Sequence, residues 1–375
     1  MKILFTGGGT GGHFYPIIAV AEKVNLMAEK EKLLEVKLFY MSNTPYDSES
    51  LYQQGLEFVP VPSGKLRNYF SIKNFFDLFK ICFGVIIAIF KMFTIYPDVV
   101  FAKGGYASFP ALFAARLLRI PVIVHESDSI PGRVTKWAGK FAKKVAVSFE
   151  QAGKYFPTEK TAWIGQPIRG ILQKVVHEGA FEYLKLDPQV PVILVLGGSQ
   201  GAKIINDAIL ETLPDLLNRY QIIHQVGVAN MGEINVLNSV ALKDHPYVAR
   251  YKPFAFLNPL AMRMAAGAAS IIVSRAGSTI FEIATWGLPS IIIPLSNSHG
   301  DHQKYNAYNY ARAGACSVIE ESNLTSHLLT SEIDRLIGNK EKMAEFSKNA
   351  KAFSKPDAAE RIAKEIIELA LKHEK

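Results

Sequence analysis

The chain has 375 residues, of which 49% are hydrophobic and 20% charged, and this predicts a globular protein too long for a single core. Its two cysteines, Cys82 and Cys316, lie far apart, which excludes a disulfide framework and a cysteine metal site and favours a reducing compartment. The net charge of +8 is uneven, because residues 1–165 hold 20 of the 42 Lys and Arg residues but only 13 of the 34 Asp and Glu residues. We therefore expect the first half to meet an anionic partner, either a membrane surface or a nucleic acid.

The N-terminal segment predicts an anion site. Residues 2–6 are typical of a short buried strand, and apolar residues at helical spacing begin at Ile17. Five glycines and one threonine separate them, at positions 7–12. Such a turn brings backbone N–H groups and a helix dipole to a phosphate, and His13 follows at its mouth. Because the strand begins at once, no signal peptide is expected, and the chain is predicted to be cytoplasmic.

The same glycines also match a dinucleotide fingerprint, at Gly7, Gly9 and Gly12. A dinucleotide site needs an acidic residue for the ribose after the second strand. Here the second predicted strand, 36–40, runs into Met41-Ser42-Asn43 instead. The sequence therefore disfavours NAD.

The stretch 71–96 predicts a helix that is apolar on all sides except one stripe, formed by Lys73, Asp77, Lys80, Gly84, Ala88 and Lys91. Its charge-free run, 81–90, is about half of what a bilayer span requires, so a spanning helix is not expected. Two interpretations remain: a crossover helix buried against a sheet, or an exposed apolar face that enters a membrane interface.

Nearby basic residues favour the membrane interpretation. Lys136, Lys140, Lys143 and Lys144 are predicted to share one helical face, and each basic group near an anionic leaflet contributes on the order of 1 kcal/mol. Nucleic acid is disfavoured because the accompanying surface is an aliphatic and phenylalanine-rich helix rather than a stacking platform. The predicted membrane contacts are Phe75, Phe79, Lys80, Phe83, Ile87, Lys136 and Lys140.

Two more turns are predicted at the same sheet edge. A strand at 98–102 precedes the glycine turn 103–108, and a strand at 120–124 ends in His125-Glu126-Ser127-Asp128. The carboxyl ends of parallel strands lie at one edge, where open α/β sheets bind ligands. Two glycine turns with His13, His125 and Glu126 at that edge favour a phosphate ligand.

The strand–glycine turn–helix pattern restarts half a chain later. The chain changes domain near 163–169, and the strand 191–196 leads into the glycine turn 197–202. Further strands are predicted near 222–227, 248–252, 270–274, 290–295 and 316–319. This repetition predicts an α/β protein with two Rossmann-like domains that face a cleft.

The second domain also predicts a nucleotide site. The strand 270–274 runs into Arg275-Ala276-Gly277-Ser278-Thr279, and Glu282 follows one helical turn later. Main-chain donors there suit a diphosphate, and the carboxylate suits a ribose diol, although Ser278 by itself is typical of an N-cap. Asp301 is a second predicted cap, and Gln303 is placed to contact sugar hydroxyls. Residues 356–372 predict an amphipathic helix.

The ordered motifs resemble the MurG family of peptidoglycan N-acetylglucosaminyltransferases, which convert lipid I to lipid II on the cytoplasmic face of the bacterial membrane. The resemblance runs from Gly7 to the last helix. Its carriers are Gly-Gly-Thr-Gly-Gly-His (8–13), Gly-Gly-Tyr (104–106), His-Glu (125–126), Gly-x-Pro-x-Arg (165–169), Gly-Gly-Ser-Gln-Gly-Ala (197–202), Arg-Ala-Gly (275–277), Ser-Thr-x-x-Glu (278–282) and Asp-His-Gln-x-x-Asn-Ala (301–307).

The resemblance implies a GT-B fold with an acceptor and membrane-facing domain at 1–165, a UDP-GlcNAc domain at 166–355, and a last helix, 356–375, that returns to the first domain. It implies a peripheral membrane protein whose partners are UDP-GlcNAc, a polyprenyl-pyrophosphate-linked muramyl peptide and an anionic membrane surface. The implied acceptor pyrophosphate contacts are Gly8, Gly9, Gly104, Gly105 and Tyr106. The implied donor contacts are Thr10, Gly11, Gly12, Asp128, Arg169, Ser199, Ser278, Thr279, Glu282 and Gln303.

The expected chemistry is attack of a muramyl hydroxyl on the anomeric carbon of GlcNAc, with loss of UDP and inversion. His13 is the predicted base, because it follows the glycine turn and its ordinary pKa of about 6.5 suits the task, and Glu126 is the alternative. No metal or other cofactor is expected. Two departures from the family pattern are Asp128, where the family usually has Asn, and a segment at 275–279 that is one residue shorter.

Other functions fit the same turns. A diacylglycerol sugar transferase or a UDP-GlcNAc epimerase would share the fold, and a non-catalytic nucleotide-binding membrane adaptor would share the site. An epimerase needs no lipid acceptor, so it leaves the apolar helix and the basic residues unexplained.

Overall fold

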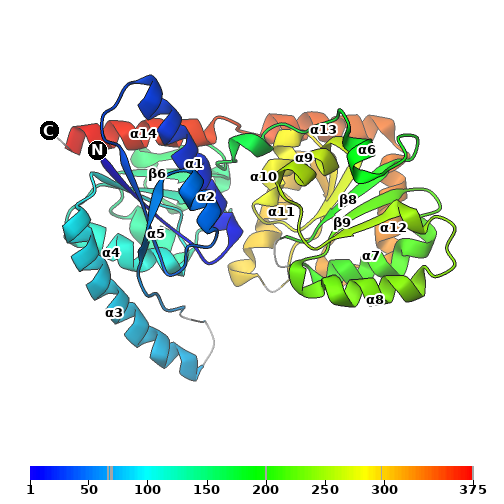
Figure 1. Ribbon diagram of the computed structural model, residues 1–375, viewed down its shortest axis with the longest axis horizontal. Helices are drawn as coiled ribbons and strands as arrows, with labels where there is room; N and C mark the ends of the chain where they lie inside the picture. The colour runs from blue at the N-terminus through cyan, green and yellow to red at the C-terminus, as the bar shows by residue number, and fades with distance from the viewer. Residues whose placement is uncertain (66, 68–70, 199–200, 297, 374–375) are drawn as a thin grey trace. The chain divides into compact units, whose positions relative to one another are not determined.

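The computed structural model describes residues 1–65, 67, 71–198, 201–296 and 298–373. The chain divides into two compact units, of which the first is Met1–Gly170 with Lys355–Lys375 and the second is Ile171–Ser354. The first unit thus contains both ends of the chain (Figure 1).

Within its described residues, the first unit has a seven-stranded parallel sheet in the order β3-β2-β1-β4-β5-β6-β7. β1 pairs with β2 on one side and with β4 on the other, so that Thr6 is aligned with both Met41 and Ala102. The elements are β1 (Lys2–Thr6), α1 (Gly11–Lys30), β2 (Lys37–Ser42), α2 (Ser48–Gln53), β3 (Leu56–Pro60), α3 (Ile72–Ile95), β4 (Val99–Ala102), α4 (Phe109–Leu117), β5 (Val122–Glu126), α5 (Arg133–Gly139), β6 (Lys144–Val147), β7 (Thr161–Trp163) and α14 (Ala358–His373).

Helices cover both faces of this sheet. On one face, Ile3 and Phe5 pack with residues of α1 and α14, including Ile17 and Ile366. On the other face, Leu4 lies in a cluster with residues of α3, α4 and α5. Alternate residues of a strand point to opposite faces, and both sides of β1 are buried, which explains the continuous apolar run in its sequence.

Helix α3 packs through its small residues and leaves its phenylalanines in solvent. Asp77, Gly84, Ala88 and Met92 are buried, and a Cβ on Gly84 would stand 1.9 Å from the carbonyl oxygen of Pro62. Phe75, Phe76, Phe79, Phe83 and Phe90 are 59–70% exposed. The stripe that interrupts the apolar surface of this helix therefore includes the side of α3 that packs on the rest of the first unit. Only small residues allow the two backbones to approach so closely. The interpretation of a helix buried against the sheet is wrong for the phenylalanine face.

The helix α3 is long and apolar enough to cross a membrane by length and composition, and 17% of its most apolar window is buried. Figure 1 shows it on the outer side of the first unit, with the end near Ile72 extending past the sheet. Ile87 differs from the other predicted membrane contacts because it is partly buried against the core beneath α3 and α4. Its membrane contact stays a prediction.

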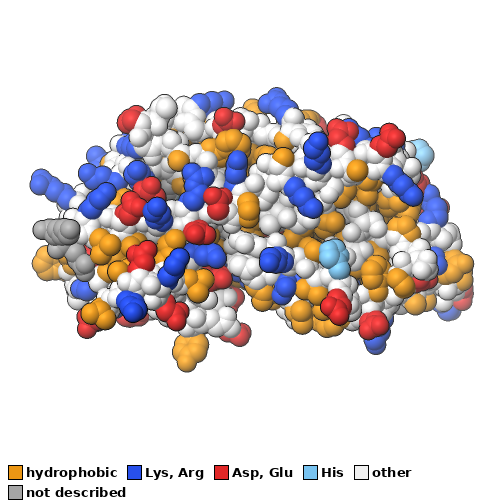
Figure 2. All heavy atoms as spheres, turned by 90° about the horizontal axis from the view of Figure 1, so that it is seen from above, with side chains coloured by type: hydrophobic (Ala, Val, Ile, Leu, Met, Phe, Trp, Pro, Cys, Tyr) orange, Lys and Arg blue, Asp and Glu red, His pale blue; other side chains and the backbone are white. Residues whose placement is uncertain are grey.

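The predicted basic helical face at 136–144 is also corrected. Helix α5 ends at Gly139, where a Cβ would stand 2.5 Å from the ring of Phe156, and the chain turns before β6. Lys144 begins β6 and lies 3.5 Å from the carboxylate of Glu365. Lys136 and Lys140 remain exposed, and Figure 2 shows other Lys and Arg side chains spread over the first unit on the face seen there.

The second unit has a six-stranded parallel sheet among its described residues, in the order β10-β9-β8-β11-β12-β13. The predicted strand at 248–252 begins only at Tyr251. The elements are α6 (Ala180–Leu184), β8 (Val192–Leu196), α7 (Lys203–Leu216), β9 (Gln221–Gln225), α8 (Met231–Ala241), β10 (Tyr251–Phe254), α9 (Pro259–Ala268), β11 (Ile271–Ser274), α10 (Thr279–Trp286), β12 (Ser290–Ile292), α11 (His302–Arg312), β13 (Cys316–Val318), α12 (Ser326–Ile337) and α13 (Lys340–Phe353).

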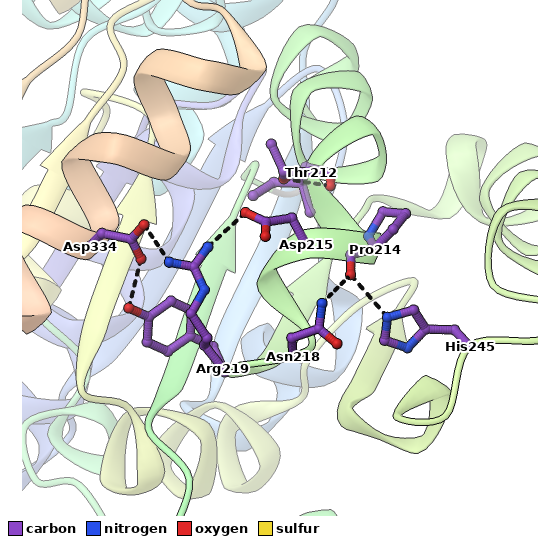
Figure 3. A network of polar contacts seen from close by, with 9 residues as sticks. Thr212, Pro214, Asp215, Asn218, Arg219, His245 and Asp334 are labelled. Carbon is purple, nitrogen blue, oxygen red and sulfur yellow. Dashed lines mark hydrogen bonds and ion pairs between the residues drawn. The ribbon is translucent and has the colours of Figure 1, made fainter.

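Polar contacts join the segment after α7 to its neighbours in the second unit (Figure 3). The guanidinium of Arg219 bonds the carboxylates of Asp215 and Asp334. The carbonyl oxygen of Pro214 accepts hydrogen bonds from Asn218 and from His245, at 3.0 and 2.9 Å. These contacts fix the end of α7 against α12 just before the amino end of β9, opposite to the carboxyl ends where ligands bind, so we assign them a structural role. The two parallel sheets with their helices confirm the predicted α/β fold class.

Candidate active site

The sheet order indicates where each unit binds a ligand. β1 lies between β2 and β4, and β8 lies between β9 and β11, so the strand order changes direction at β1 and at β8. In parallel α/β sheets, ligands bind beyond the carboxyl ends of the strands at this point. The candidate turns are therefore 7–12 and 103–105 in the first unit, and 275–278 with the described residues that follow β8, 197–198 and 201–202, in the second.

The two glycine turns of the first unit touch each other. A Cβ on Gly105 would stand 3.0 Å from the carbonyl oxygen of Gly8 and 3.7 Å from the ring of His13. A Cβ on Gly9 would stand 3.0 Å from the ring of Tyr106. Gly8, Gly9, Gly104 and Gly105 all have positive φ angles, which glycine adopts without strain. The structure thus brings together the five residues that the resemblance assigned to a pyrophosphate.

Polar side chains from β2 hold the first turn. The hydroxyls of Tyr40 and Ser42 both donate to the carbonyl oxygen of Gly7, each at 2.8 Å. The amide of Asn43 approaches the hydroxyl of Tyr106 at 3.4 Å. These contacts orient one carbonyl of the turn away from its mouth, which leaves the glycine N–H groups as the natural anion donors there.

His13 and Thr10 lie together at the N-terminus of α1. The Nδ1 atom of His13 is 3.0 Å from the hydroxyl oxygen of Thr10, the N-cap residue, whose side chain makes no capping bond in the described structure. This contact fixes the orientation of the half-buried imidazole. No acidic residue occupies the first turn of α1, so the positive end of the helix dipole is not offset by a local carboxylate.

Glu126 is buried, and its carboxylate holds the turn that follows β5. Its two oxygens accept the backbone N–H groups of Asp128 and Gly132, both at 3.0 Å. Burial first, and then the nearby charge of Asp128, raise the pKa of Glu126 to about 7 against the opposing effects of Lys103 and the two N–H groups. The geometry favours a role in shaping this turn.

His125 is fully buried, with its Nε2 atom 2.9 Å from the carbonyl oxygen of Gly165. Burial first, and then the charge of Lys103, lower the pKa of His125 well below its usual value, so the ring is neutral. The side chain therefore joins the turn after β5 to the segment that contains Arg169.

Arg169 reaches the first turn of α1. Its guanidinium carbon lies 3.9 Å from the centre of the Tyr15 ring, a geometry typical of a cation–π contact. A Cβ on Gly11 would stand 3.3 Å from the same ring. The structure thus gathers Arg169, Thr10, Gly11 and Gly12 around one helix N-terminus, whereas Asp128 follows β5, which β4 separates from β1 in the sheet.

In the second unit, three predicted residues lie at the start of α10. Ser278 occupies the N-cap position, yet the described structure gives its hydroxyl no capping bond, and Thr279 and Glu282 follow, all half-buried. A Cβ on Gly277 would meet no atom within 4 Å. The backbone at this helix N-terminus therefore faces open space, which an anion can enter.

Arg275, the first residue of the motif after β11, makes contacts within the second unit. Its guanidinium lies 2.6 Å from the carboxylate of Glu321 and donates to the carbonyl oxygen of Ile293 at 3.2 Å. The side chain therefore ties β11 to β12 and to the segment after β13. No pattern in the sequence points to Glu321 as the partner, because it lies 46 residues away.

Helix α11 supports the same turn. The amide of Asn306 donates to the carbonyl oxygen of Ala276 at 3.1 Å. Gln303 accepts the N–H of Leu295 with its side-chain oxygen at 3.1 Å, which fixes its amide group. Asp301, a predicted cap, has a left-handed conformation and makes no capping bond in the part of the chain that is described. Ser199, a predicted donor contact, lies outside the described residues.

Among the described residues, no group of three or more His, Cys, Asp or Glu side chains is placed to hold a metal ion.

Lys103 is a charged residue at the turns of the first unit to which the sequence analysis assigns no role. Lys103 is 1% exposed and donates a hydrogen bond to Ser127. Its signal in the sequence was a lysine directly after an apolar strand and directly before two glycines.

Comparisons with known proteins place segments of both units in one glycosyltransferase family. The glycosyltransferase family 28 N-terminal domain matches residues 3–147, and the family 28 C-terminal domain matches residues 192–362. A Bacillus cereus relative, UDP-N-acetylglucosamine–N-acetylmuramyl-(pentapeptide) pyrophosphoryl-undecaprenol N-acetylglucosamine transferase 2, is 36% identical over 343 residues, which cover 91% of this chain and 92% of the relative.

Solved structures give the same fold. The Acinetobacter baumannii MurG structure has a TM-score of 0.73 and 25% identity, and the match covers 98% of this chain and 99% of that one. A Neisseria meningitidis UDP-GlcNAc 2-epimerase bound to UDP-GlcNAc has a TM-score of 0.67 at 15% identity, covering 99% of this chain and 100% of that one. The second likeness shows the fold alone.

Proposed function

We infer the reaction from family membership: this chain belongs to the UDP-N-acetylglucosamine–N-acetylmuramyl-(pentapeptide) pyrophosphoryl-undecaprenol N-acetylglucosamine transferases of glycosyltransferase family 28. It is a glycosyltransferase that moves N-acetylglucosamine from UDP-GlcNAc to lipid I and so forms lipid II for peptidoglycan. The observation that carries this conclusion is the 36% identity over 91% of the chain. An epimerase shares the fold at 15% identity only.

For the acceptor, we propose that the turns at 7–12 and 103–105 bind its pyrophosphate. The contact between Gly8 and Gly105 supports this, because it places the N–H groups of two glycine turns in one small region. The absence of side chains there lets phosphate oxygens approach the backbone. Tyr106 lies against Gly9 and closes one side.

For the donor, we propose that the start of α10 binds UDP-GlcNAc. Backbone donors at 277–279 suit the diphosphate, and Glu282, one turn later, suits the ribose hydroxyls. Gln303, whose amide is oriented by Leu295, suits the sugar. In the first unit, Thr10, Gly11, Gly12, Asp128 and Arg169 are the proposed donor contacts, and Ser199 completes the set.

His13 is the proposed catalytic base. The muramyl 4-hydroxyl attacks the anomeric carbon of GlcNAc, its proton passes to the imidazole, and the bond to the UDP oxygen breaks with inversion. The contact of Nδ1 with Thr10 holds the ring at the acceptor turns, and a positioned base contributes about 10²–10⁴ in rate. Glu126 is less suitable because backbone N–H groups already occupy both of its oxygens. We assign it to positioning.

We also propose that the exposed face of α3 rests on the cytoplasmic surface of the membrane. Phe75, Phe79 and Phe83 present apolar area, and exposed Lys80, Lys136 and Lys140 supply positive charge for anionic lipid. This arrangement suits an enzyme that acts on a lipid-linked substrate and is peripheral to the membrane. Nucleic acid has no place in the proposal.

One experiment tests the reaction. The purified protein is incubated with labelled UDP-GlcNAc and a short-chain lipid I analogue, and label transfer to the analogue is measured with and without the acceptor. We expect transfer, with UDP released only in the presence of the acceptor. Formation of UDP-ManNAc without acceptor would indicate an epimerase, transfer to diacylglycerol a glycolipid synthase, and tight UDP-GlcNAc binding without turnover an adaptor.

A further inference from the structure

Lys103 touches all three turns at the carboxyl edge of the first sheet. Its backbone N–H donates to the carbonyl oxygen of Thr6 at 2.9 Å, and a Cβ on Gly7 would stand 3.1 Å from the Lys103 Cβ. Its ammonium donates to the hydroxyl of Ser127, which donates in turn to the side-chain oxygen of Gln166 at 2.9 Å. The side chain thus runs from beneath the first glycine turn to the turn after β5.

This lysine is buried among charges of the opposite sign. Glu126 and Asp128 from β5 and its following turn both act on it, and the neutral ring of His125 lies on the same strand. Burial lowers the pKa of Lys103 to about 8, while the two carboxylates oppose that fall. An ammonium buried to 1% exposure is costly unless such groups compensate it.

The same arrangement accounts for an aspartate beside the glycine turns. A carboxylate at position 128 repels any phosphate nearby, whereas an amide there would not. In this chain, the charge of Asp128 acts on the buried ammonium of Lys103, whose hydrogen-bond partner is the adjacent Ser127. The pair of residues therefore restores the local charge that a polyphosphate ligand needs.

We propose that Lys103 is a positioning residue of the acceptor site: it fixes the Gly104–Gly105 turn against the Ser127–Asp128 turn and offsets the charge of Asp128 toward the pyrophosphate of the acceptor. This proposal rests on the proposed function of the same site. It adds a residue whose role is to hold the turns and their charge, without contact to the reacting atoms.

The test is a double-mutant cycle of Lys103→Met and Asp128→Asn, measured as kcat and KM for a short-chain lipid I analogue. Lys103→Met should lower kcat/KM for the acceptor by on the order of 100-fold, chiefly by raising KM. The substitution releases the Gly104–Gly105 turn from the Ser127–Asp128 turn, and it leaves the carboxylate of Asp128 without a nearby positive charge. Adding Asp128→Asn should recover about tenfold of that loss, since the unopposed charge disappears. Losses that simply multiply, without recovery, would overturn the proposal.

Controls separate this result from other failures. Lys30→Met removes an exposed lysine at the end of α1 and should leave both constants within about twofold. If the wild-type protein transfers no label, the proposed function fails; if it does and Lys103→Met behaves like Lys30→Met, only the role of Lys103 fails.

A second variant covers a Lys103→Met protein that does not fold. Ser127→Ala keeps the ammonium but removes its hydroxyl partner, and it should raise the acceptor KM by about 3–10-fold while thermal unfolding stays cooperative. An unchanged acceptor KM in folded Ser127→Ala would overturn the proposal equally.

Discussion

At the scale of single residues, Gly105 is placed where no side chain fits. Its φ of 81° with ψ of 162° is a conformation essentially restricted to glycine, and the Cβ position lies 3.0 Å from the carbonyl oxygen of Gly8. An added methyl group must therefore separate the two glycine turns. The substitution should therefore lower both the stability of the protein and its activity toward the acceptor.

We expect Gly105→Ala to cost about 1–3 kcal/mol of stability and to lower kcat/KM for the acceptor by at least about tenfold. Gly55→Ala is the matched control, because Gly55 also has a positive φ but no atom within 4 Å of its Cβ position. It should be destabilised with full activity. Chemical denaturation and label transfer measure the two effects, and an active Gly105→Ala enzyme contradicts the proposed pyrophosphate site.

His13 gives the sharpest catalytic prediction. His13→Ala should lower kcat by about 10²–10⁴-fold, because it removes the proton acceptor. The Kd for UDP-GlcNAc should change by no more than about threefold, because the donor diphosphate is assigned to the start of α10. His327→Ala removes an exposed histidine from α12 and should keep wild-type kcat. Equal kcat values for all three proteins would eliminate His13 as the base.

Residue types predicted the turns better than they predicted the partners of each side chain. The glycine turns, with His13 beside the first of them, follow from local spacing alone. The contacts of Arg275 and Lys103 do not, because their partners Glu321 and Ser127 come from segments that follow other strands. A charge in the sequence does not reveal whether it meets a ligand or a buried carboxylate.

At the scale of elements, α3 shows which of two sequence interpretations the structure selects. The apolar residues alone allow either a buried phenylalanine face or one exposed to a membrane, and the buried side carries Gly84 and Ala88. Close backbone packing against residue Pro62 selects the small residues, and the large ones are left in solvent. An exposed apolar surface of this kind indicates a site that binds a membrane or another molecule.

The triple variant Phe75→Ser, Phe79→Ser, Phe83→Ser should bind phosphatidylglycerol-containing vesicles at least about 1000-fold more weakly than wild type, as each buried Phe contributes about 1.5–3 kcal/mol. Cosedimentation measures this, with stability nearly unchanged because all three are exposed. Val228→Ser, Val236→Ser, Val240→Ser is the matched control, since it removes three exposed apolar residues from the second unit.

Equal weakening in both triple variants would contradict a specific role for α3. A native thiol gives a second measurement: Cys82 on α3 is exposed, whereas Cys316 is buried. Maleimide should therefore label Cys82 alone in the folded protein, and anionic vesicles should slow that labelling. Phosphatidylcholine vesicles should slow it less, because they lack the charge that attracts the lysines.

At the scale of the whole molecule, the chain repeats one architecture and then returns to its first half. The repeated strand–glycine turn–helix pattern predicted two parallel sheets, because that pattern depends on local apolar spacing. The order of the strands in each sheet came only from the structure. So did the return of the chain, in which α14 packs on α1 across more than three hundred residues of sequence.

This return makes the last helix part of the first core. Ile366 of α14 is fully buried beside Ile3 and Phe5, so Ile366→Ala should destabilise the first unit by about 2–5 kcal/mol. Leu371→Ala, in the same helix, alters a residue that is 38% exposed and should cost far less. Leu336→Ala, fully buried in the second unit, should destabilise that unit instead. Differential scanning calorimetry with limited proteolysis distinguishes the two. If Ile366→Ala and Leu336→Ala lower one shared transition equally, the two units unfold as a single cooperative body.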